Sequence, residues 1–228
     1  MDRQRTGGVF YGIGVGPGDP ELLTLKAVGL LRQAEVVAAA DTGGPSLALR
    51  IAAEHIRDKE LLLCPAPMTR DPHRLKAAWE EGTERVCAQL DKGRTVAFVT
   101  LGDPTIYSTC GYLFQRIRER GFSAQLVPGV TSFCAAAAAA GVSLCEGEES
   151  LLVLPASSPL LEESRKLPVN RVVMKAGRSL ERVRDSLGER AVLVENCGME
   201  EERIIPLSEA ESAGYFATVL QGDPSALK

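Results

Sequence analysis

The chain has 228 residues, of which 45% are hydrophobic and 25% charged, as expected for a globular protein with a sizeable core. Its net charge of −4 argues against a nucleic-acid-binding face, which would need a basic excess. No apolar run reaches membrane-spanning length, and residues 1–8 lack the apolar core of a signal peptide. We therefore expect a cytoplasmic protein whose partners include neither a nucleic acid nor a membrane.

The six cysteines are scattered, and none forms a C-x-x-C pair. The spacing indicates neither a zinc site nor a redox motif, so we expect no protein-bound metal and a reducing environment.

The chain opens with an expected strand over residues 9–15, which runs into a glycine-rich loop over residues 12–20. A dinucleotide fingerprint fails there, because the position of its third glycine holds Pro17 or Asp19. No Gly-Lys-Ser/Thr follows, so a phosphate-binding P-loop also fails. We expect the glycines of this loop to let its backbone lie close to neighbouring atoms. We expect Asp19 to cap a helix over residues 21–33.

Strands over residues 34–40 and 61–63 alternate with helices over residues 46–56 and 72–92, which is typical of a parallel sheet. A proline-rich loop over residues 64–72 carries Arg70, and Arg74 follows it. The pattern leaves two alternatives for this loop: a plain connector, or a wall of a cleft that accepts an anionic ligand.

The stretch over residues 95–109 is the centre of the pattern. A buried strand over residues 95–101 stops at Gly102-Asp103-Pro104, and Ser108 or Thr109 is placed to cap the next helix. In open α/β sheets, ligands bind at this carboxyl edge of the strands. A turn without a ligand remains the alternative at this point.

The second half begins after a strand over residues 123–127, with a Pro-Gly turn and an alanine-rich helix from Thr131 or Ser132 to Gly141. We place the domain boundary here, giving an N-terminal lobe over residues 1–128 and a C-terminal lobe over residues 129–228. Strands follow at residues 150–155, 171–174, 191–196, 203–207 and 215–220, with a helix at 180–187. The last three strands have no helices between them, which favours antiparallel pairing, and the last two are expected at the sheet edges. The predicted fold is α/β, with a parallel N-terminal sheet, a mixed C-terminal sheet and a ligand cleft between the lobes.

Four segments together resemble the tetrapyrrole methylases, a family of two-lobed, S-adenosylmethionine-dependent enzymes. They are Gly14–Ala27, Gly102–Tyr107, Val127–Ser132 and Val173–Lys175. Within the family, Asp103–Thr109, Pro67–Thr69, Thr131–Phe133 and Tyr215-Phe216 are similar to the branch that methylates C20 of precorrin-2 or cobalt-factor II. Two features depart from that branch: the short glycine-rich loop Thr42–Pro45, and Ala217 at a position where serine is expected.

The resemblance implies a role for particular residues. S-Adenosylmethionine, with S-adenosylhomocysteine as product, would contact Pro17, Leu101, Gly102, Asp103, Ile106, Thr131, Ser132, Met174, Asn196 and Cys197. The acceptor would be a polycarboxylate tetrapyrrole, with or without cobalt, near Arg70, Arg74, Tyr107 and Arg178. The arginines are alternatively solvated surface charges. The resemblance also implies a homodimer.

Asp103 and Lys175 are the candidate catalytic pair, since each ends a strand, one in each half of the chain. Asp103 would remove the proton from the methylated carbon, and Lys175 would orient it or bind a substrate carboxylate. Alternatively, Asp103 only stabilises its own loop.

Two other functions remain open from the sequence. One is a methylase of the same fold that acts on another porphyrinoid, such as uroporphyrinogen III or another precorrin, on a diphthamide precursor or on ribosomal RNA. The other is a nucleotide-binding α/β protein, which the failed fingerprint disfavours.

Overall fold

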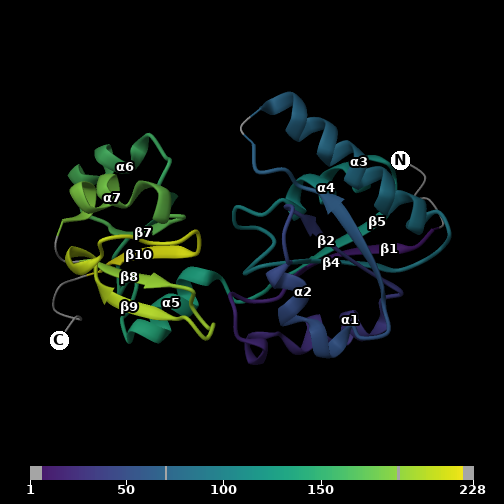
Figure 1. The fold of residues 1–228 in the computed structure, drawn as a ribbon, viewed down its shortest axis with the longest axis horizontal. Helices are drawn as coiled ribbons and strands as arrows, with labels where there is room; N and C mark the ends of the chain where they lie inside the picture. Colours follow the sequence, from purple (N-terminus) through teal and green to yellow (C-terminus); the bar gives the residue numbers. More distant parts are fainter. Residues whose placement is uncertain (1–6, 70, 189–190, 223–228) are drawn as a thin grey trace. The chain divides into compact units, whose positions relative to one another are not determined.

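The computed structural model describes residues 7–69, 71–188 and 191–222. The chain divides into two compact units, Met1–Thr131 and Ser132–Lys228. Each unit contains a five-stranded sheet with helices on its faces (Figure 1). Arg70, one of the expected substrate contacts, lies outside the described residues.

The first sheet is entirely parallel, as the alternation of strands and helices predicted, with the order β3-β2-β4-β1-β5. Its strands are β1 (Val9–Gly14), β2 (Val36–Asp41), β3 (Glu60–Pro65), β4 (Val96–Thr100) and β5 (Ser123–Val127). The register pairs Gly14 with Thr100 and Ile13 with Val127, so β1, β4 and β5 all end at one edge.

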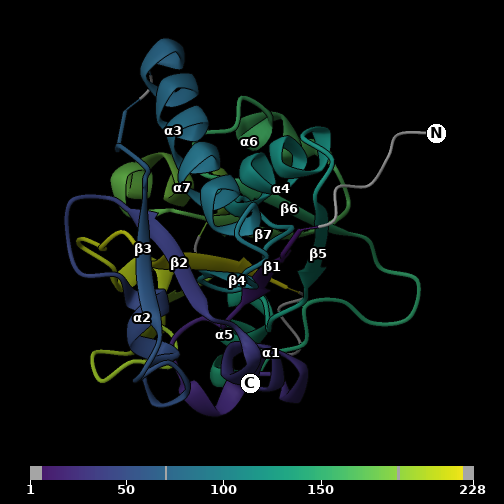
Figure 2. The ribbon, with the colours of Figure 1, turned by 90° about the vertical axis from the view of Figure 1, so that its right-hand side faces the viewer.

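Helices cover both faces of this sheet (Figures 1 and 2). One face packs Ile13 and Val99 against α1 (Leu25–Gln33) and α2 (Leu47–Ile51). The other packs Phe10 and Phe98 against α3 (Pro72–Leu90) and α4 (Cys110–Glu119). The neighbouring strands β1 and β4 therefore send their following helices to opposite faces. This is a topological switch point, where open α/β sheets form a crevice at the carboxyl ends of the strands.

The single helix expected over residues 21–33 is broken into two parts. Asp19 does act as a cap, accepting a hydrogen bond from Glu21 N at 2.8 Å, but the helix it caps is the short 3₁₀ turn η1 (Pro20–Leu22). Leu23 is extended, and the Thr24 hydroxyl then caps α1 through Ala27 N at 3.1 Å. The side chain of Thr24 thus starts a second helix that periodicity alone does not separate from the first. A similar break follows α2, where the chain continues as η2 (Ala53–His55).

The second sheet is mixed, as expected, with the order β6-β7-β10-β8-β9. Its strands are β6 (Leu151–Pro155), β7 (Asn170–Met174), β8 (Val192–Glu195), β9 (Arg203–Pro206) and β10 (Ala217–Gln221). In the described residues, β6 and β7 pair in parallel, whereas β10 pairs antiparallel with both β7 and β8, and β8 with β9. The expected edge position of the last strand is wrong. β10 lies in the centre, because its buried Val219 and Leu220 provide apolar side chains for both faces.

Helices also cover both faces of the second sheet (Figure 1). Ala136 and Ala137 of α5 (Ser132–Ala140) pack on Val172, Val194 and Leu220, where small side chains let the helix approach closely. The opposite face carries α6 (Leu160–Glu163) and α7 (Leu180–Leu187). Short 3₁₀ turns complete the unit: η3 (Ser164–Lys166), η4 (Gly177–Ser179) and η5 (Leu207–Glu209). Among the helices of the described ranges, none has the length and apolarity needed to cross a membrane.

Candidate active site

Two glycines join the loops after β1 and β4 at the switch point. Gly102 N donates to Gly16 O at 2.7 Å, and Gly16 N donates to Gly102 O at 3.3 Å. Both residues have a left-handed backbone, with φ of 79° for Gly16 and 67° for Gly102, which favours glycine. Pro17 is buried beside this bridge and Leu101 is half-buried. Three of the expected cofactor contacts therefore lie at the predicted carboxyl edge of the sheet.

Three strand ends meet here at glycines, and two of these, Gly14 and Gly129, leave no room for a side chain. A Cβ built on Gly129, just after β5, would lie 2.3 Å from Gly102 O and 2.7 Å from the Gly14 carbonyl carbon. A Cβ built on Gly14 would lie 2.7 Å from Gly129 N. All these neighbours are backbone atoms, which cannot swing away as a side chain can. From the sequence, Gly129 was predicted only to form a turn. The sequence feature that could have revealed its role is the glycine that ends each of three strands, which the fold makes adjacent.

Asp103 ties the β4 loop to the β5 loop. Its side chain is 8% exposed, and its Oδ1 accepts bonds from the Thr105 backbone N–H at 2.8 Å and from the Thr105 hydroxyl. Its Oδ2 accepts from Gly129 N at 3.0 Å. These hydrogen bonds are the ones that a loop-stabilising role requires. A carboxylate has further lone pairs, so Asp103 can still accept another hydrogen bond.

The loop after Asp103 carries two further candidates. Ile106 is half-buried, and its N–H donates to Asp103 O at 3.3 Å. Tyr107 is 48% exposed and has a φ of 48°, a conformation that bulky residues rarely adopt. Thr131, two residues beyond Gly129, is half-buried. The first unit thus gathers Pro17, Leu101, Gly102, Asp103, Ile106, Tyr107 and Thr131 on the loops after β1, β4 and β5.

The second unit gathers its candidates at the ends of β7 and β8. Met174 is half-buried and accepts a bond from Ala156 N at 2.8 Å; Lys175 follows it and is exposed. Asn196, after β8, donates its backbone N–H to Phe216 O at 3.2 Å and its side-chain amide to Glu201 O at 3.3 Å. Since β10 is antiparallel to both strands, its first residues lie at this same edge. Ser132, the remaining candidate of this unit, is the first residue of α5.

Backbone strain coincides with the candidate residues. Across the described ranges, the non-glycine residues with positive φ are Tyr107, Lys175 (59°) and Asn196 (53°). All three were singled out from the sequence, and each follows a strand. Left-handed conformations cost an L-residue energy and persist where the surroundings enforce them, which is most often at functional sites.

Cys197 can contribute contact but not nucleophilic chemistry. Burial, together with the nearby charge of Glu202, raises the pKa of its thiol to about 11. The thiol therefore stays protonated at neutral pH, and a protonated thiol is a poor nucleophile.

Of the expected arginines, the structure describes Arg74 and Arg178, and both are exposed. Arg74 lies in the first turn of α3, after the edge strand β3, and its N–H donates to Asp71 Oδ1 at 3.4 Å. Arg178 lies in η4, three residues beyond Lys175. Their exposure is compatible both with a substrate contact and with a solvated surface charge.

An ion pair at the edge of the second sheet, in which Glu195 is buried and Arg203 is exposed, was missed from the sequence. Glu195, 9% exposed, accepts bonds at Oε2 from Arg203 Nη2 at 2.7 Å and Nε at 3.1 Å. Its Oε1 accepts from Gly214 N. The sequence signal would have been an acidic residue ending a buried strand with an arginine at the start of the next one.

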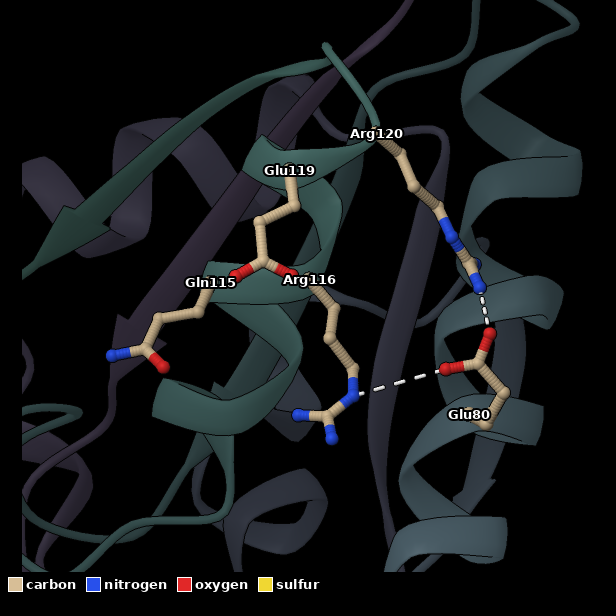
Figure 3. A pocket seen from close by; sticks show the side chains of 5 residues that line it. All are labelled: Glu80, Gln115, Arg116, Glu119 and Arg120. Carbon is tan, nitrogen blue, oxygen red and sulfur yellow. Dashed lines mark hydrogen bonds and ion pairs between the residues drawn. The ribbon is translucent and has the colours of Figure 1, made fainter.

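A polar pocket lies elsewhere on the first unit, between α3 and α4 (Figure 3). In it, Arg116 and Arg120 both reach Glu80, with Arg116 Nε 3.8 Å from Glu80 Oε2. These arginines lie near the end of α4, whereas the helix begins beside the Asp103 loop. Their charge is already paired, and the pocket is not part of the candidate site.

The candidate residues offer backbone N–H and C=O groups, hydroxyls and apolar side chains. In each unit taken by itself, groups of this kind suit a ligand with an amino-acid end, sugar hydroxyls or an aromatic base better than they suit a metal ion. In the part of the chain that is described, no three His, Cys, Asp or Glu side chains gather closely enough to hold one.

Comparison with known proteins gives consistent results. Residues 9–212 match the family model of the Tetrapyrrole (Corrin/Porphyrin) Methylases. The chain is 36% identical over 232 residues to the cobalamin biosynthesis protein CobIJ of Mycobacterium tuberculosis H37Rv, covering 93% of the chain but 46% of CobIJ, so it spans about half of that relative. It is 34% identical over 232 residues to a precorrin-2 C(20)-methyltransferase of Sinorhizobium sp, covering 93% of the chain and 94% of the relative. A uroporphyrin-III C-methyl transferase from Thermus thermophilus, solved with S-adenyl homocysteine, has the same fold, with a TM-score of 0.70, 24% identity and coverage of 94% and 92%.

Proposed function

Because the chain belongs to the tetrapyrrole methylase family, we propose that it methylates C20 of precorrin-2 or cobalt-factor II with S-adenosylmethionine, in the synthesis of the corrin ring of cobalamin. The Sinorhizobium relative supports this position on the ring, since the similarity extends over 94% of its length. CobIJ, named for cobalamin biosynthesis, supports the pathway.

One observation carries the cofactor part of the proposal: the glycine bridge at the switch point between β1 and β4, where open α/β sheets bind ligands. Glycines there leave the backbone of Leu101 and Gly102 approachable, while Ile106 and Pro17 add apolar surface. In the proposed site, S-adenosylmethionine is held by Pro17, Leu101, Gly102, Asp103, Ile106, Thr131, Ser132, Met174, Asn196 and Cys197. The hydroxyls of Thr131 and Ser132 suit its amino-acid or ribose groups, and Met174 suits its adenine.

The cofactor supplies an activated methyl group on a sulfonium centre, so the protein needs no strong nucleophile. Its own residues have to hold the acceptor carbon in line with that methyl group at near-attack distance, and positioning of this kind can account for much of a rate enhancement. The rigid glycine bridge at Gly16 and Gly102 suits this task, because neither loop can shift without breaking the other's hydrogen bonds.

The acceptor carbon gains the methyl group and loses a proton, which needs an acceptor. We propose Asp103 as that base and Lys175 as the residue that orients it or binds a substrate carboxylate. Asp103 would then do two things, since the same carboxylate holds Thr105 and Gly129 in place. The two roles are separable by experiment.

The acceptor carries many carboxylates, whereas the chain is net acidic, so its cations have to be concentrated locally. We propose Arg70, Arg74 and Arg178 as those cations, with Tyr107 as a further contact. Arginine can grip a carboxylate with two hydrogen bonds, where lysine offers a point charge.

The experiment is a turnover assay with S-adenosylmethionine that carries a ¹³C-labelled methyl group. Precorrin-2 and cobalt-factor II are offered separately, and carbon NMR locates the label in the product. The proposal expects the label on C20 with at least one of them, and the faster one identifies the metal state of the substrate. A label on another ring carbon, or turnover with uroporphyrinogen III alone, would reassign the chain within its family. A thermal shift with NAD but none with S-adenosylhomocysteine would reject the cofactor.

We also propose the homodimer that the family resemblance implies. The chain has a mass of 24.4 kDa, so light scattering should give twice that value. A monomeric mass at the assay concentration would refute the dimer and leave the proposed chemistry untouched.

A further inference from the structure

Two aromatic rings stand exposed at the edge of the second sheet. Tyr215 and Phe216 immediately precede β10, and they are 47% and 39% exposed. Their rings meet edge to face, with centroids 5.1 Å apart and planes at 81°. They lie where the turns after β7 and β8 end, because Asn196 N donates to Phe216 O and Ala176 N donates to Ala217 O at 3.0 Å.

The backbone that carries this pair is held from two sides. Glu195 accepts from Gly214 N, while Arg203, paired with Glu195, donates to Ser212 O at 2.7 Å. On the other side, a Cβ built on Gly177 would lie 1.9 Å from Gly214 O, so the turn after β7 touches the same segment. A half-buried carboxylate–guanidinium pair that binds two points of one loop fixes that loop in place.

The charges around the pair differ between its two sides. Toward β7 lie the exposed cations Lys175 and Arg178. Toward β8 lies an acidic hairpin, Glu200–Glu202, in which Glu202 accepts from Gly198 N at 2.7 Å. A ligand that covers the rings and carries carboxylates would therefore place them on the β7 side.

We propose that Tyr215 and Phe216 form a platform for the flat, conjugated ring of the polycarboxylate acceptor, which stacks on the face of one of these perpendicular rings and meets the edge of the other, and that Glu195 with Arg203 positions this platform. The inference rests on the proposed function, since it names the surface that takes the macrocycle. Exposed aromatic faces bind flat conjugated ligands by stacking, and the adjacent cations suit the carboxylates at the periphery. A rigid platform holds the macrocycle in one fixed position, and methylation of a single ring carbon requires such positioning.

The test replaces Phe216 by Leu, which keeps an apolar side chain and removes the aromatic face. Because the residue is exposed, the fold should tolerate the change. The expected result is a tenfold or larger rise in the KM for the macrocycle, with the S-adenosylhomocysteine Kd changed less than twofold in calorimetry. Tyr112→Leu is the matched control: Tyr112 is 45% exposed and stacks on Trp79 in the first unit, and its replacement should leave both constants unchanged.

The positioning role is tested by Glu195→Gln, which puts an amide where the carboxylate meets Arg203. We expect a smaller rise in the macrocycle KM with kcat largely retained, and recovery of the wild-type KM in Glu195→Asp if the shorter carboxylate still reaches Arg203. Glu162→Gln is the control, since Glu162 pairs with Arg182 through Nε at 2.7 Å on the surface of the same unit. It should leave the KM unchanged.

Several results would overturn the platform. In Phe216→Leu, an unchanged macrocycle KM would remove its role, and a raised S-adenosylhomocysteine Kd would assign the rings to the cofactor. A halved mass in light scattering would assign them to a contact between two copies of the chain. Failure of the proposed function looks different, because the wild-type protein would then bind no S-adenosylhomocysteine and methylate neither acceptor.

Discussion

The two sheet edges that carry the candidate residues differ in how many of their loops meet at glycines and in which side chains tie them. In the first unit, the loops after β1, β4 and β5 meet through backbone atoms, with Gly14, Gly102 and Gly129 in contact. In the second unit, backbone contacts also join the turns after β7 and β8 to the segment before β10, and the side chains of Glu195 and Arg203 hold that segment in addition. Where backbone atoms of two loops are in contact, there is no room for an added side-chain atom. Where side chains join the loops, each contact can be altered separately. Substitutions at the glycines whose backbone is in contact should therefore have all-or-none effects, and substitutions at Glu195 and Arg203 should have graded effects.

The largest expected effect comes from Gly129→Ala. The added methyl group would lie 2.3 Å from Gly102 O and near the Gly14 backbone, so three strand ends would have to separate. We expect a loss of about 3 kcal/mol in the free energy of unfolding, measured by urea denaturation. Gly111→Ala in α4 is the control, because nothing lies within 4 Å of its Cβ, and it should stabilise the protein by about 0.5–1 kcal/mol. Equal stabilities of the two variants would contradict the backbone contact.

Asp103→Asn separates the two roles of this carboxylate. An amide keeps an acceptor for the Thr105 donors but presents an N–H group to Gly129 N–H, so that hydrogen bond is lost. If Asp103 is the base, kcat should fall by about 100-fold or more at saturating S-adenosylmethionine. If it only shapes the loop, the S-adenosylhomocysteine Kd should rise about tenfold, or about 1.4 kcal/mol, with kcat retained.

The control for this change is Asp71→Asn, in which another loop aspartate accepts from two backbone N–H groups, those of His73 and Arg74. Asparagine caps helices about as well as aspartate, so stability and turnover should both persist. If Asp103→Asn keeps wild-type turnover and cofactor affinity, solvent must accept the proton of the methylated carbon. Asp103 would then be neither the base nor a residue that shapes the cofactor site.

Lys175→Gly tests whether strain in the second unit serves function. Glycine relieves the left-handed conformation but adds freedom to the unfolded chain, so we expect a gain of about 0.5 kcal/mol in the free energy of unfolding. Turnover should fall several-fold because the amine is gone. Asn196→Gly should change stability less, since asparagine tolerates this conformation. Full activity in Lys175→Gly would mean that the strained lysine has no catalytic or substrate-binding part.

The smallest effect concerns Cys197, whose pKa of about 11 keeps it a thiol. Iodoacetamide at pH 8 should label the exposed Cys134 and Cys145 before Cys197. Because burial raises the pKa, labelling of Cys197 should become faster as pH rises toward 11. S-Adenosylhomocysteine should slow it further without protecting Cys145, as mass spectrometry of peptides can show. Rapid labelling at pH 8 would contradict the burial of this turn.

Local signals in the sequence predicted most elements. The bounds of β5 and α7 agree with the expected ranges, the turn at Gly102 lies at the end of β4, and the family resemblance is confirmed by the match over residues 9–212. These features depend on periodicity, turn residues and motifs, which act over a few neighbouring positions. The break between η1 and α1 at Thr24 was not predicted, because a hydroxyl cap does not interrupt the apolar pattern that indicates the helix.

Features that depend on strand order could not be predicted. The contact of Gly14 with Gly129 needs β5 beside β1, and the central place of β10 needs it between β7 and β8. The clamp of Glu195 on Gly214 likewise joins residues that only the sheet brings together. The sequence thus indicated which residues end strands, but the fold decides which of those ends touch.

The most direct test of the site is a pair of calorimetric titrations with S-adenosylhomocysteine, on Gly102→Ala and Gly43→Ala. Both glycines are left-handed, with φ of 67° and 87°, so both alanines should carry a similar backbone strain of about 1–2 kcal/mol. Gly43 lies in the loop after β2 with nothing within 4 Å of its Cβ, whereas Gly102 forms the bridge to Gly16. We predict that Gly102→Ala stays folded and binds at least tenfold more weakly than wild type, while Gly43→Ala binds like wild type. Equal, wild-type affinity in the two folded variants would place the cofactor away from the Gly16–Gly102 bridge and contradict the account.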